Sequence, residues 1–358
     1  MEQPMKVGLS LSGGGAIGAY EVGVVRALAE SGTDIHAVAG ASIGALNGAI
    51  LASSNTLAQA AERMAEIWSH LGRSKVLAMN KSVYLSLLAQ FGFYCGTPVL
   101  SNAGSIIFSA MRRAALATGV SSLQNDSLFS DQPLIDLMNR YMDMDALSSG
   151  LPLYVSLYPT EGGMKDILNC VAAEFGLGAT NDSEFIHVQS LPAEQRKQAL
   201  LASAALPLLF KSREINGVHY SDGGMGGWSS MQGNTPVKPL VDAGCNMIIV
   251  THLCDGSAWD RHDFSDTIVL EIRPQQTLKR NNGIFGGAKD LLGFSSTHIS
   301  SWIEQGYQDT LSAIKRIQQP LQARQALRIS EGAVLDSQAN SCQADKELRN
   351  AMDRLKKA

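Results

Sequence analysis

Two glycine-rich turns, each lying between a short apolar strand and a helix, constrain the fold of this chain more than any other feature. The first turn follows a predicted strand over residues 5–11 and reads S-G-G-G over residues 12–15. The second follows a predicted strand over residues 36–39 and reads G-A-S-I-G over residues 40–44. The spacing of apolar residues predicts a helix after each turn. Strand, turn and helix repeated in this way are typical of the opening of a mostly parallel α/β sheet.

The rest of the chain continues this alternation of short strands and helices. The patterns predict a helix at residues 195–205 and strands at residues 153–157, 167–171, 185–188, 215–220, 247–251 and 268–272. The sequence beyond Pro320 is polar and rich in helix formers, which predicts a solvated helical tail over residues 321–358. We therefore expect one large α/β domain over residues 1–320, followed by this tail.

The composition excludes several classes of protein. A hydrophobic fraction of 45% with 17% charged residues supplies enough apolar material for a large core. The net charge of −4 and the pI near 6.0 argue against the broad basic surface that binds a nucleic acid polymer. Five scattered cysteines indicate neither a disulfide framework nor a zinc site. The first residues lack a signal-peptide pattern and no stretch is apolar enough to span a bilayer, so we expect a cytoplasmic protein.

Residues 67–125 differ in kind from the rest, because this segment contains no Asp or Glu. Its middle part mixes aromatic and aliphatic side chains with Gly, Ser and Pro, which predicts a cap inserted after the second helix. Such a segment suits contact with an anionic lipid surface, at which it would be peripheral, or with the phosphates of a ligand. The alternative is that its apolar residues pack on the core and its basic residues are solvated. The basic residues of the cap are Arg73, Lys75, Lys81, Arg112 and Arg113.

Ser42 lies at the centre of a G-x-S-x-G motif, between a predicted strand and a buried helix. In a nucleophile elbow the serine occupies this strained strand-to-helix turn, and the glycines allow the backbone to approach closely. The first helical turn also directs N–H groups towards developing negative charge. The alternative is an ordinary tight turn built from small residues.

Gly13, Gly14 and Gly15 form the other turn, where consecutive amides can converge on one oxyanion. The same region reads as G-x-G-x-x-G through Gly18, which would indicate a dinucleotide site. That site needs an acidic residue at the end of the second strand. Asp34 precedes this strand instead, which argues against the dinucleotide interpretation.

Asp222 begins a D-G-G turn at the end of a predicted strand, a pattern that by itself indicates only a turn. The order of the three motifs, however, resembles that of the patatin-like phospholipases. The approach to the aspartate, A-S-A-A-L-P over residues 202–207, and N-T-P over residues 234–236 extend the resemblance. It covers about residues 6–252.

The resemblance implies a three-layer α/β/α patatin-like fold and hydrolysis of phospholipid acyl esters without a metal or organic cofactor. By the same resemblance Ser42 is the nucleophile, Asp222 is its partner, and the amides of residues 13–15 form the oxyanion hole. A carboxylate can accept the serine proton near neutral pH only if burial raises its pKa or the proton moves in concert with attack. One position departs from the family pattern, because Ile17 stands where a basic residue is usual.

Three further interpretations stay open at the level of sequence. An α/β-hydrolase would use Ser42, Asp222 and His252 as a triad in this order, although only one strand and one helix precede Ser42 here. A catalytically silent patatin-like protein would bind lipid or nucleotide without turnover. The chain also looks like the bacterial effectors that cyclic dinucleotides such as cyclic GMP-AMP activate in anti-phage signalling. A homo-oligomer is compatible with the sequence.

Overall fold

A computed structural model describes the chain in several stretches. Contacts divide the chain into two units, residues 1–310 and residues 311–358. The described stretches are residues 4–73, 132–162, 180–205, 210–227, 230–253, 259–281 and 293–357, with Lys165, Asp166, Asn169, Ala173 and Asp290 between them.

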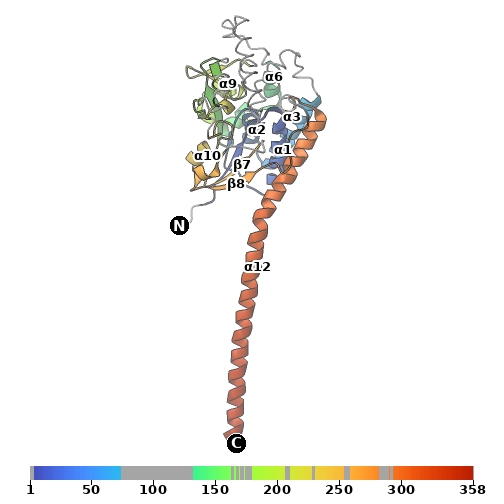
Figure 1. Cartoon of the computed structure of the whole chain (residues 1–358), viewed down its shortest axis with the longest axis vertical. Helices are drawn as coiled ribbons and strands as arrows, with labels where there is room; N and C mark the ends of the chain where they lie inside the picture. The colour runs from blue at the N-terminus through green and yellow to red at the C-terminus, as the bar shows by residue number, and fades with distance from the viewer. Residues whose placement is uncertain are drawn as a thin grey trace, which may run out of the picture. The chain divides into compact units, whose positions relative to one another are not determined.

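One mixed sheet of eight strands organises the described part of the first unit (Figure 1). Strands β3, β2, β1, β7 and β8 are parallel neighbours in this order, which confirms the mostly parallel sheet. Strands β4 and β6 pair antiparallel with β3, and β5 pairs antiparallel with β6. The strands are β1 Val7–Leu11, β2 Ala37–Gly40, β3 Leu153–Pro159, β4 Glu184–His187, β5 Arg213–Ile215, β6 Val218–Asp222, β7 Met247–Thr251 and β8 Ile268–Ile272.

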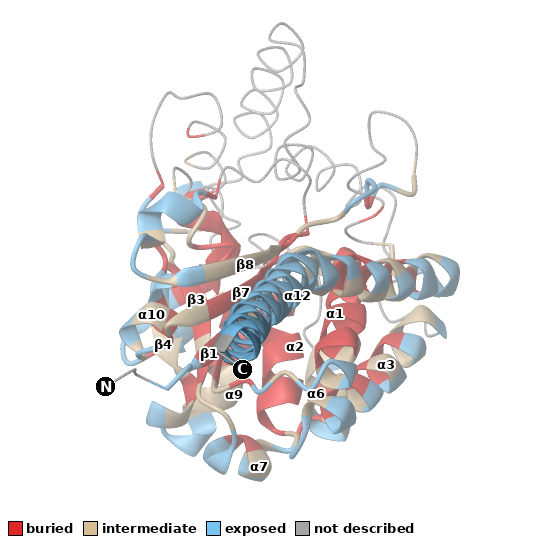
Figure 2. Ribbon diagram, turned by 90° about the horizontal axis from the view of Figure 1, so that it is seen from below, coloured by how far each residue is buried: buried red, intermediate tan, exposed pale blue. Residues whose placement is uncertain are grey.

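Helices cover both faces of the sheet, so the three-layer α/β/α prediction is confirmed. Helices α2 and α9 pack on strands of one face, and α10 packs on β1 and β2 from the opposite face. Figure 2 shows α10 on one side of the strands and α1 and α3 on the other. The helices are α1 Ala19–Glu30, α2 Ile43–Ala52, α3 Leu57–Arg73, α6 Gln132–Tyr141, α7 Met144–Ser149, α9 Ala193–Ser203, α10 Lys238–Asp242 and α12 Ser296–Lys357.

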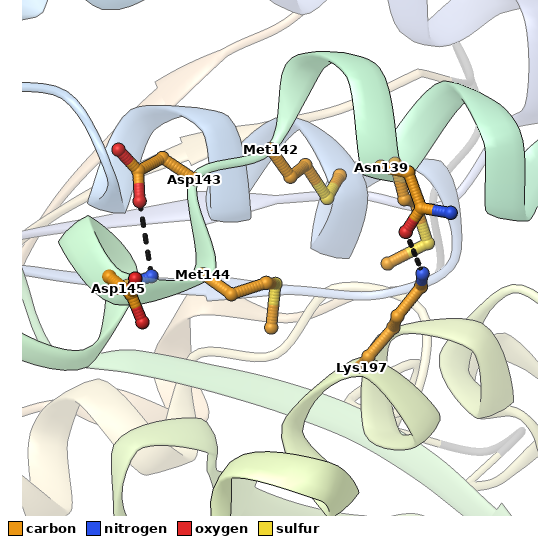
Figure 3. A pocket seen from close by; sticks show the side chains of 7 residues that line it. Asn139, Met142, Asp143, Met144, Asp145 and Lys197 are labelled. Atoms are coloured by element: carbon orange, nitrogen blue, oxygen red, sulfur yellow. Dashed lines mark hydrogen bonds between the residues drawn. The ribbon is translucent and has the colours of Figure 1, made fainter.

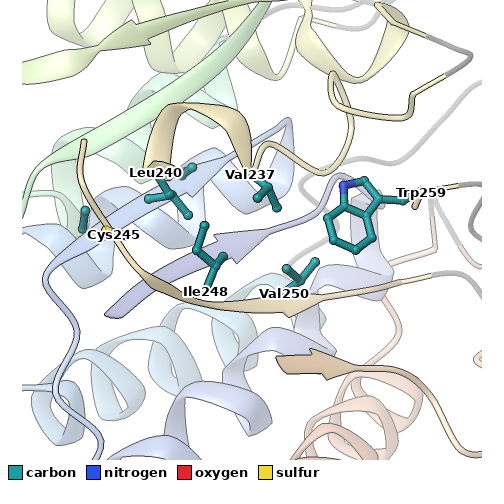
Figure 4. Packing of buried hydrophobic residues seen from close by; sticks show 8 residues of the cluster. Val237, Leu240, Cys245, Ile248, Val250 and Trp259 are labelled. Carbon is teal, nitrogen blue, oxygen red and sulfur yellow. The ribbon is translucent and has the colours of Figure 1, made fainter. Parts of the chain in front are cut away.

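The apolar side chains of the parallel strands alternate between these two layers, as the pleat of a sheet requires. Ile248 and Val250 point towards α10, where they pack with Val237, Leu240 and Trp259 (Figure 4). On the other face of the sheet, the side chains of Val38 and Leu153 lie beside Gly48 of α2. Because the central strands are buried on both faces, they read as continuous apolar runs in the sequence.

The structure differs from two of the predicted strands. Residues 218–220 of the strand predicted at residues 215–220 belong to β6. Asn216 and Gly217 make a tight turn with φ values of 51° and 83°, so Ile215 ends β5 and the segment lies in the hairpin of β5 and β6. An Asn-Gly pair is a strong hairpin signal, since both central residues of a type I′ turn need positive φ. Most of the strand predicted at residues 167–171 lies outside the described residues, and Asn169, the described one, is helical.

Two predicted boundaries shift. The cap was expected to start at residue 67, but Ile67 and Trp68 lie on the buried face of α3, which ends at Arg73. The remainder of the predicted cap, residues 74–125, lies outside the described residues. The C-terminal helix begins at Ser296, well before residue 321, and continues through Pro320. Among the described residues, no helix combines the length and the apolarity needed to cross a membrane.

Candidate active site

Ser42 occupies a strained turn between β2 and α2. Its φ of 51° lies in the left-handed region, which is rare for a residue other than glycine. The turn is tight enough to require glycine on both sides. A Cβ on Gly40 would lie 2.4 Å from the carbonyl oxygen of Gly44, and a Cβ on Gly44 would lie 2.4 Å from the carbonyl oxygen of Leu11. This geometry is that of a nucleophile elbow, and it leaves the Ser42 side chain half-buried.

The Ser42 hydroxyl donates a hydrogen bond directly to Asp222, with 2.7 Å between Oγ and Oδ2. Asp222 ends β6, which runs antiparallel to β3 and places Asp222 opposite Leu157. The other carboxylate oxygen, Oδ1, accepts the backbone N–H of Gly224 at 2.9 Å. Two side chains that the sequence separates by 180 positions are thus in contact at one end of the sheet.

Burial makes the Asp222 carboxylate a stronger base than an ordinary aspartate. The side chain is 1% exposed, and desolvation raises its pKa from 3.8 to about 6. The hydrogen bonds from Ser42 and Gly224 oppose this rise because they favour the charged form. Asp222 can therefore accept a proton near neutral pH, which a carboxylate of ordinary pKa does poorly.

The glycine turn after β1 lies beside Ser42, but its three amides are not equivalent. The N–H of Gly13 donates to the carbonyl oxygen of Asn234 at 3.1 Å, so this amide is already used. In the described part of the chain, the backbone N–H groups of Gly14 and Gly15 have no hydrogen-bond acceptor. A Cβ on Gly13 would lie 3.2 Å from the Cβ of Ser42, which shows how closely the turn approaches the serine. Among the described residues of this turn, Gly14 and Gly15 are therefore the ones whose N–H groups remain available to bind an oxyanion.

The family of the chain follows from comparison with known proteins. A model of the patatin-like phospholipases matches residues 9–241, which is more than half of the sequence and includes both turns and Asp222. The chain belongs to the patatin-like phospholipase family.

Two curated relatives match short segments of the patatin-like chain. Lysophospholipase nte1 of Aspergillus terreus is 44% identical over 72 residues, which are 20% of this chain and 4% of the relative. Neuropathy target esterase sws of Drosophila persimilis is 43% identical over 63 residues, which are 18% of this chain and 4% of the relative. The chain therefore spans only a small part of the length of these curated relatives.

Two solved structures also align with the patatin-like chain over most of its length. VipD from Legionella pneumophila has 14% identity and a TM-score of 0.39, with 87% of this chain and 67% of VipD covered. ExoU from the type III secretion system of Pseudomonas aeruginosa, solved with SpcU, has 16% identity and a TM-score of 0.27, with 86% and 53% covered.

Ser203 is a residue of this patatin-like site that the sequence motifs did not single out as functional. Its hydroxyl accepts the backbone N–H of Ser42 at 3.0 Å and donates to the carbonyl oxygen of Ser156 at 2.8 Å. The carbonyl oxygen of Ala205, two residues after Ser203, accepts a hydrogen bond from the backbone N–H of Asp222 at 2.9 Å. The end of α9 thus connects the serine turn to the aspartate turn. The A-S-A-A-L-P motif was the available signal, because it places a serine at this helix end.

His252 is engaged by a different carboxylate. Its Nε2 lies 3.1 Å from Oε2 of Glu271, which also accepts from Nε of Arg273 at 2.7 Å. Burial lowers the pKa of His252, which is 1% exposed, and favours the neutral ring. The hydrogen bond from His252, aided by Arg273, holds the pKa of Glu271 at about 2. The Ser42–Asp222 contact is direct and does not include this histidine.

The residues predicted from the cap are only partly described. Arg73 is exposed at the end of α3, where its guanidinium donates to the backbone and the hydroxyl of Ser69. Lys75, Lys81, Arg112 and Arg113 lie outside the described residues. Ile17, which replaces the basic residue usual in the family, is 5% exposed and packs as an apolar residue.

A cavity of 270 Å³ lies elsewhere in the patatin-like unit, among α6, α7 and α9 (Figure 3). Figure 3 shows Met142 and Met144 on one side of it and Lys197 pointing towards Asn139. None of its lining residues is a predicted site residue. The full lining is Met138, Asn139, Met142, Asp143, Met144, Asp145 and Lys197.

Proposed function

We propose that this chain is a serine lipid acyl hydrolase of the phospholipase A type, working through a dyad of Ser42 and Asp222. The observation that carries the proposal is the hydrogen bond of 2.7 Å from the Ser42 hydroxyl to a carboxylate buried to 1% exposure. Ester hydrolysis by a serine needs a base in contact with the hydroxyl and donors for the oxyanion. Asp222 is the base in this proposal, and the amides of Gly14 and Gly15 are the donors.

In the acylation step, Ser42 Oγ attacks the acyl carbonyl carbon while its proton passes to Oδ2 of Asp222. The carbonyl oxygen becomes an oxyanion, for which the amides of Gly14 and Gly15 are the donors. Gly13 supports the turn through its bond to Asn234. Collapse of the tetrahedral intermediate breaks the ester bond, and the departing glycerol oxygen takes the proton from Asp222.

In the deacylation step, water attacks the acyl-serine and gives a proton to Asp222. The fatty acid leaves and the proton returns to Ser42 Oγ, so each residue regains its starting state. One carboxyl group acts as base and then as acid in both steps. A pKa of about 6 suits this exchange, because the group is ionised at neutral pH and still returns its proton readily.

An active-site label tests the nucleophile directly. A fluorophosphonate probe should label the native protein and should fail to label Ser42→Ala. Release of fatty acid from phosphatidylglycerol vesicles should disappear in the same variant. Equal labelling of both proteins, with the modified peptide mapped to another serine, would contradict the assignment of Ser42.

We also propose membrane phospholipid as the substrate, because the segment of residues 67–125 has no acidic residue and carries aromatic and basic side chains. Flotation of Ser42→Ala with vesicles tests the surface without degrading the lipid. Stronger binding to phosphatidylglycerol vesicles than to phosphatidylcholine vesicles is expected, and it should weaken as salt rises. Equal recovery with both lipids would exclude selection of an anionic surface.

Activation by a cyclic dinucleotide is a finer proposal, which rests on the resemblance to nucleotide-activated effectors and on the same basic segment. Cyclic GMP-AMP added to native protein with vesicles should raise the rate of fatty acid release. Linear dinucleotide at equal concentration is the matched control. An unchanged rate over a panel of cyclic dinucleotides would limit the function to unregulated hydrolysis.

A further inference from the structure

Glu21, in the first turn of α1, is an acidic side chain with no exposed surface. Its Oε2 accepts the side-chain N–H of Asn47 at 2.8 Å, and its Oε1 lies 3.1 Å from the hydroxyl of Thr251. The backbone N–H of Ser12 also donates to the carboxyl group. Among the described residues, the groups that face Glu21 from β1, α2 and β7 are therefore all uncharged.

The hydrogen bonds around Thr251 accommodate a proton on Glu21. The Thr251 hydroxyl contacts two oxygens, the carbonyl oxygen of Ser10 at 3.0 Å and Oε1 of Glu21 at 3.1 Å. The hydroxyl carries one hydrogen, and a carbonyl oxygen can only accept. Both contacts are satisfied when a protonated Glu21 donates to Thr251 and Thr251 donates to Ser10. Burial favours this proton, because desolvation raises the pKa of Glu21 from 4.5 to about 8 although the hydrogen bonds from Asn47, Thr251 and Ser12 favour the charged form.

Each partner of Glu21 belongs to a part of the candidate active site. Ser12 directly precedes the glycine turn, and its hydroxyl donates to the carbonyl oxygen of Thr251 at 2.6 Å. Asn47 lies on α2, the helix that starts after Ser42, and its side-chain oxygen accepts the indole N–H of Trp68 at 3.0 Å. Glu21 therefore joins the backbone of the glycine turn to the helix that carries the serine.

We propose that Glu21 is a positioning residue that acts in its neutral form, holding the glycine turn at a fixed distance from Ser42. The inference rests on the proposed function, since it concerns the donors for the oxyanion. Glu21 itself touches no substrate. Its ionisation would place an unpaired negative charge beneath the turn, which opposes an oxyanion above the turn and costs stability.

The test compares Glu21→Gln with Glu21→Ala over a range of pH. Glutamine is neutral at every pH, and its amide can donate to Thr251 and accept from Asn47. At pH 7, Glu21→Gln should keep kcat within about threefold, whereas Glu21→Ala should lower kcat about 10- to 100-fold with little change in KM. Native activity should fall as the pH rises through about 8, and Glu21→Gln should lack this fall. If Glu21 served only in packing, Glu21→Gln would show the same fall in activity above about pH 8 as the native protein.

Unfolding by urea tests the protonation state of Glu21 without depending on catalysis. The raised pKa means that the stability associated with Glu21 is fully present below pH 4.5 and is lost as the pH rises towards about 8. The unfolding midpoint of Glu21→Gln should therefore exceed that of the native protein by a margin that grows from pH 5 to pH 8.5. A constant margin, or a Glu21→Gln variant as inactive as Glu21→Ala, would overturn the inference. Absence of hydrolysis in every protein would refute the proposed function instead, and the urea result would still decide the state of Glu21.

Discussion

Replacing Asp222 by asparagine should make the protein less active and more stable at the same time. Asparagine keeps the shape of the side chain and an oxygen for the N–H of Gly224, but it cannot take the proton of Ser42. Loss of a general base typically lowers the rate by about 10² to 10⁴. We expect kcat/KM for a soluble ester to fall within this range at pH 7.5.

The gain in stability follows from the burial of the carboxylate. The folded protein raises the pKa of Asp222 from 3.8 to about 6, so the unfolded chain releases this proton first as the pH rises. At about 1.4 kcal/mol for each pKa unit, the native protein loses about 3 kcal/mol of unfolding free energy between pH 4 and pH 7. Asparagine has no charge to desolvate and escapes this loss. The advantage of the variant should be small near pH 4 and constant above about pH 7.

Urea denaturation of the two proteins at several values between pH 4 and pH 8 measures this difference. The variant creates an Asn-Gly dipeptide that can deamidate to aspartate, so its intact mass is checked before each series. Ser42→Ala is the matched control, because it also abolishes hydrolysis but retains the buried carboxylate. Its stability should fall with pH at least as steeply as that of the native protein, because loss of the Ser42 hydrogen bond removes a contact that lowers the pKa of Asp222.

Two results would refute this reasoning. A stability difference that does not change with pH would mean that Asp222 is not desolvated in the folded state. Hydrolysis at an undiminished rate by Asp222→Asn, with the intact mass confirming asparagine, would mean that another group accepts the serine proton.

Three further predictions test other parts of the site. Ser203→Ala removes the acceptor for the Ser42 amide and should lower kcat about tenfold and the unfolding free energy by about 1 kcal/mol, measured by ester hydrolysis and urea denaturation. Gly14→Ala places a Cβ 2.6 Å from the flexible side chain of Leu253, so the circular dichroism spectrum should persist while kcat falls about 10²-fold. His252→Ala should retain ester hydrolysis within about tenfold, and a loss of about 10³ or more would support a triad instead.

The sequence alone located the turns that carry the chemistry, because turn formation depends mainly on local backbone preferences. The glycines around Ser42 were readable as a nucleophile elbow without knowledge of distant contacts, and Gly40 and Gly44 indeed contact backbone atoms that leave no room for a Cβ. Strand β7 was also predicted with its observed bounds, since a continuous buried strand has a distinct apolar pattern. The turn at Asn216 was missed although its local signal was present.

Glu21 shows what only the tertiary structure decided. In the sequence it reads as an ordinary acidic residue in the first turn of a helix, where the helix dipole favours negative charge. Its side chain instead has no exposed surface and is enclosed by Asn47 of α2, Thr251 of β7 and the backbone of Ser12 after β1. The acid is therefore desolvated, which no local pattern reveals.

The same limit applies to the dyad. The family resemblance paired Ser42 with Asp222 in the sequence, but their contact joins positions 180 residues apart and arises from the pairing of β6 with β3. The basicity of Asp222 and the use of the Gly13 amide by Asn234 also depend on this packing. Local backbone chemistry thus determined which residues were candidates, and long-range burial decided their protonation and which donors remained available, because desolvation depends on the elements that close over a side chain.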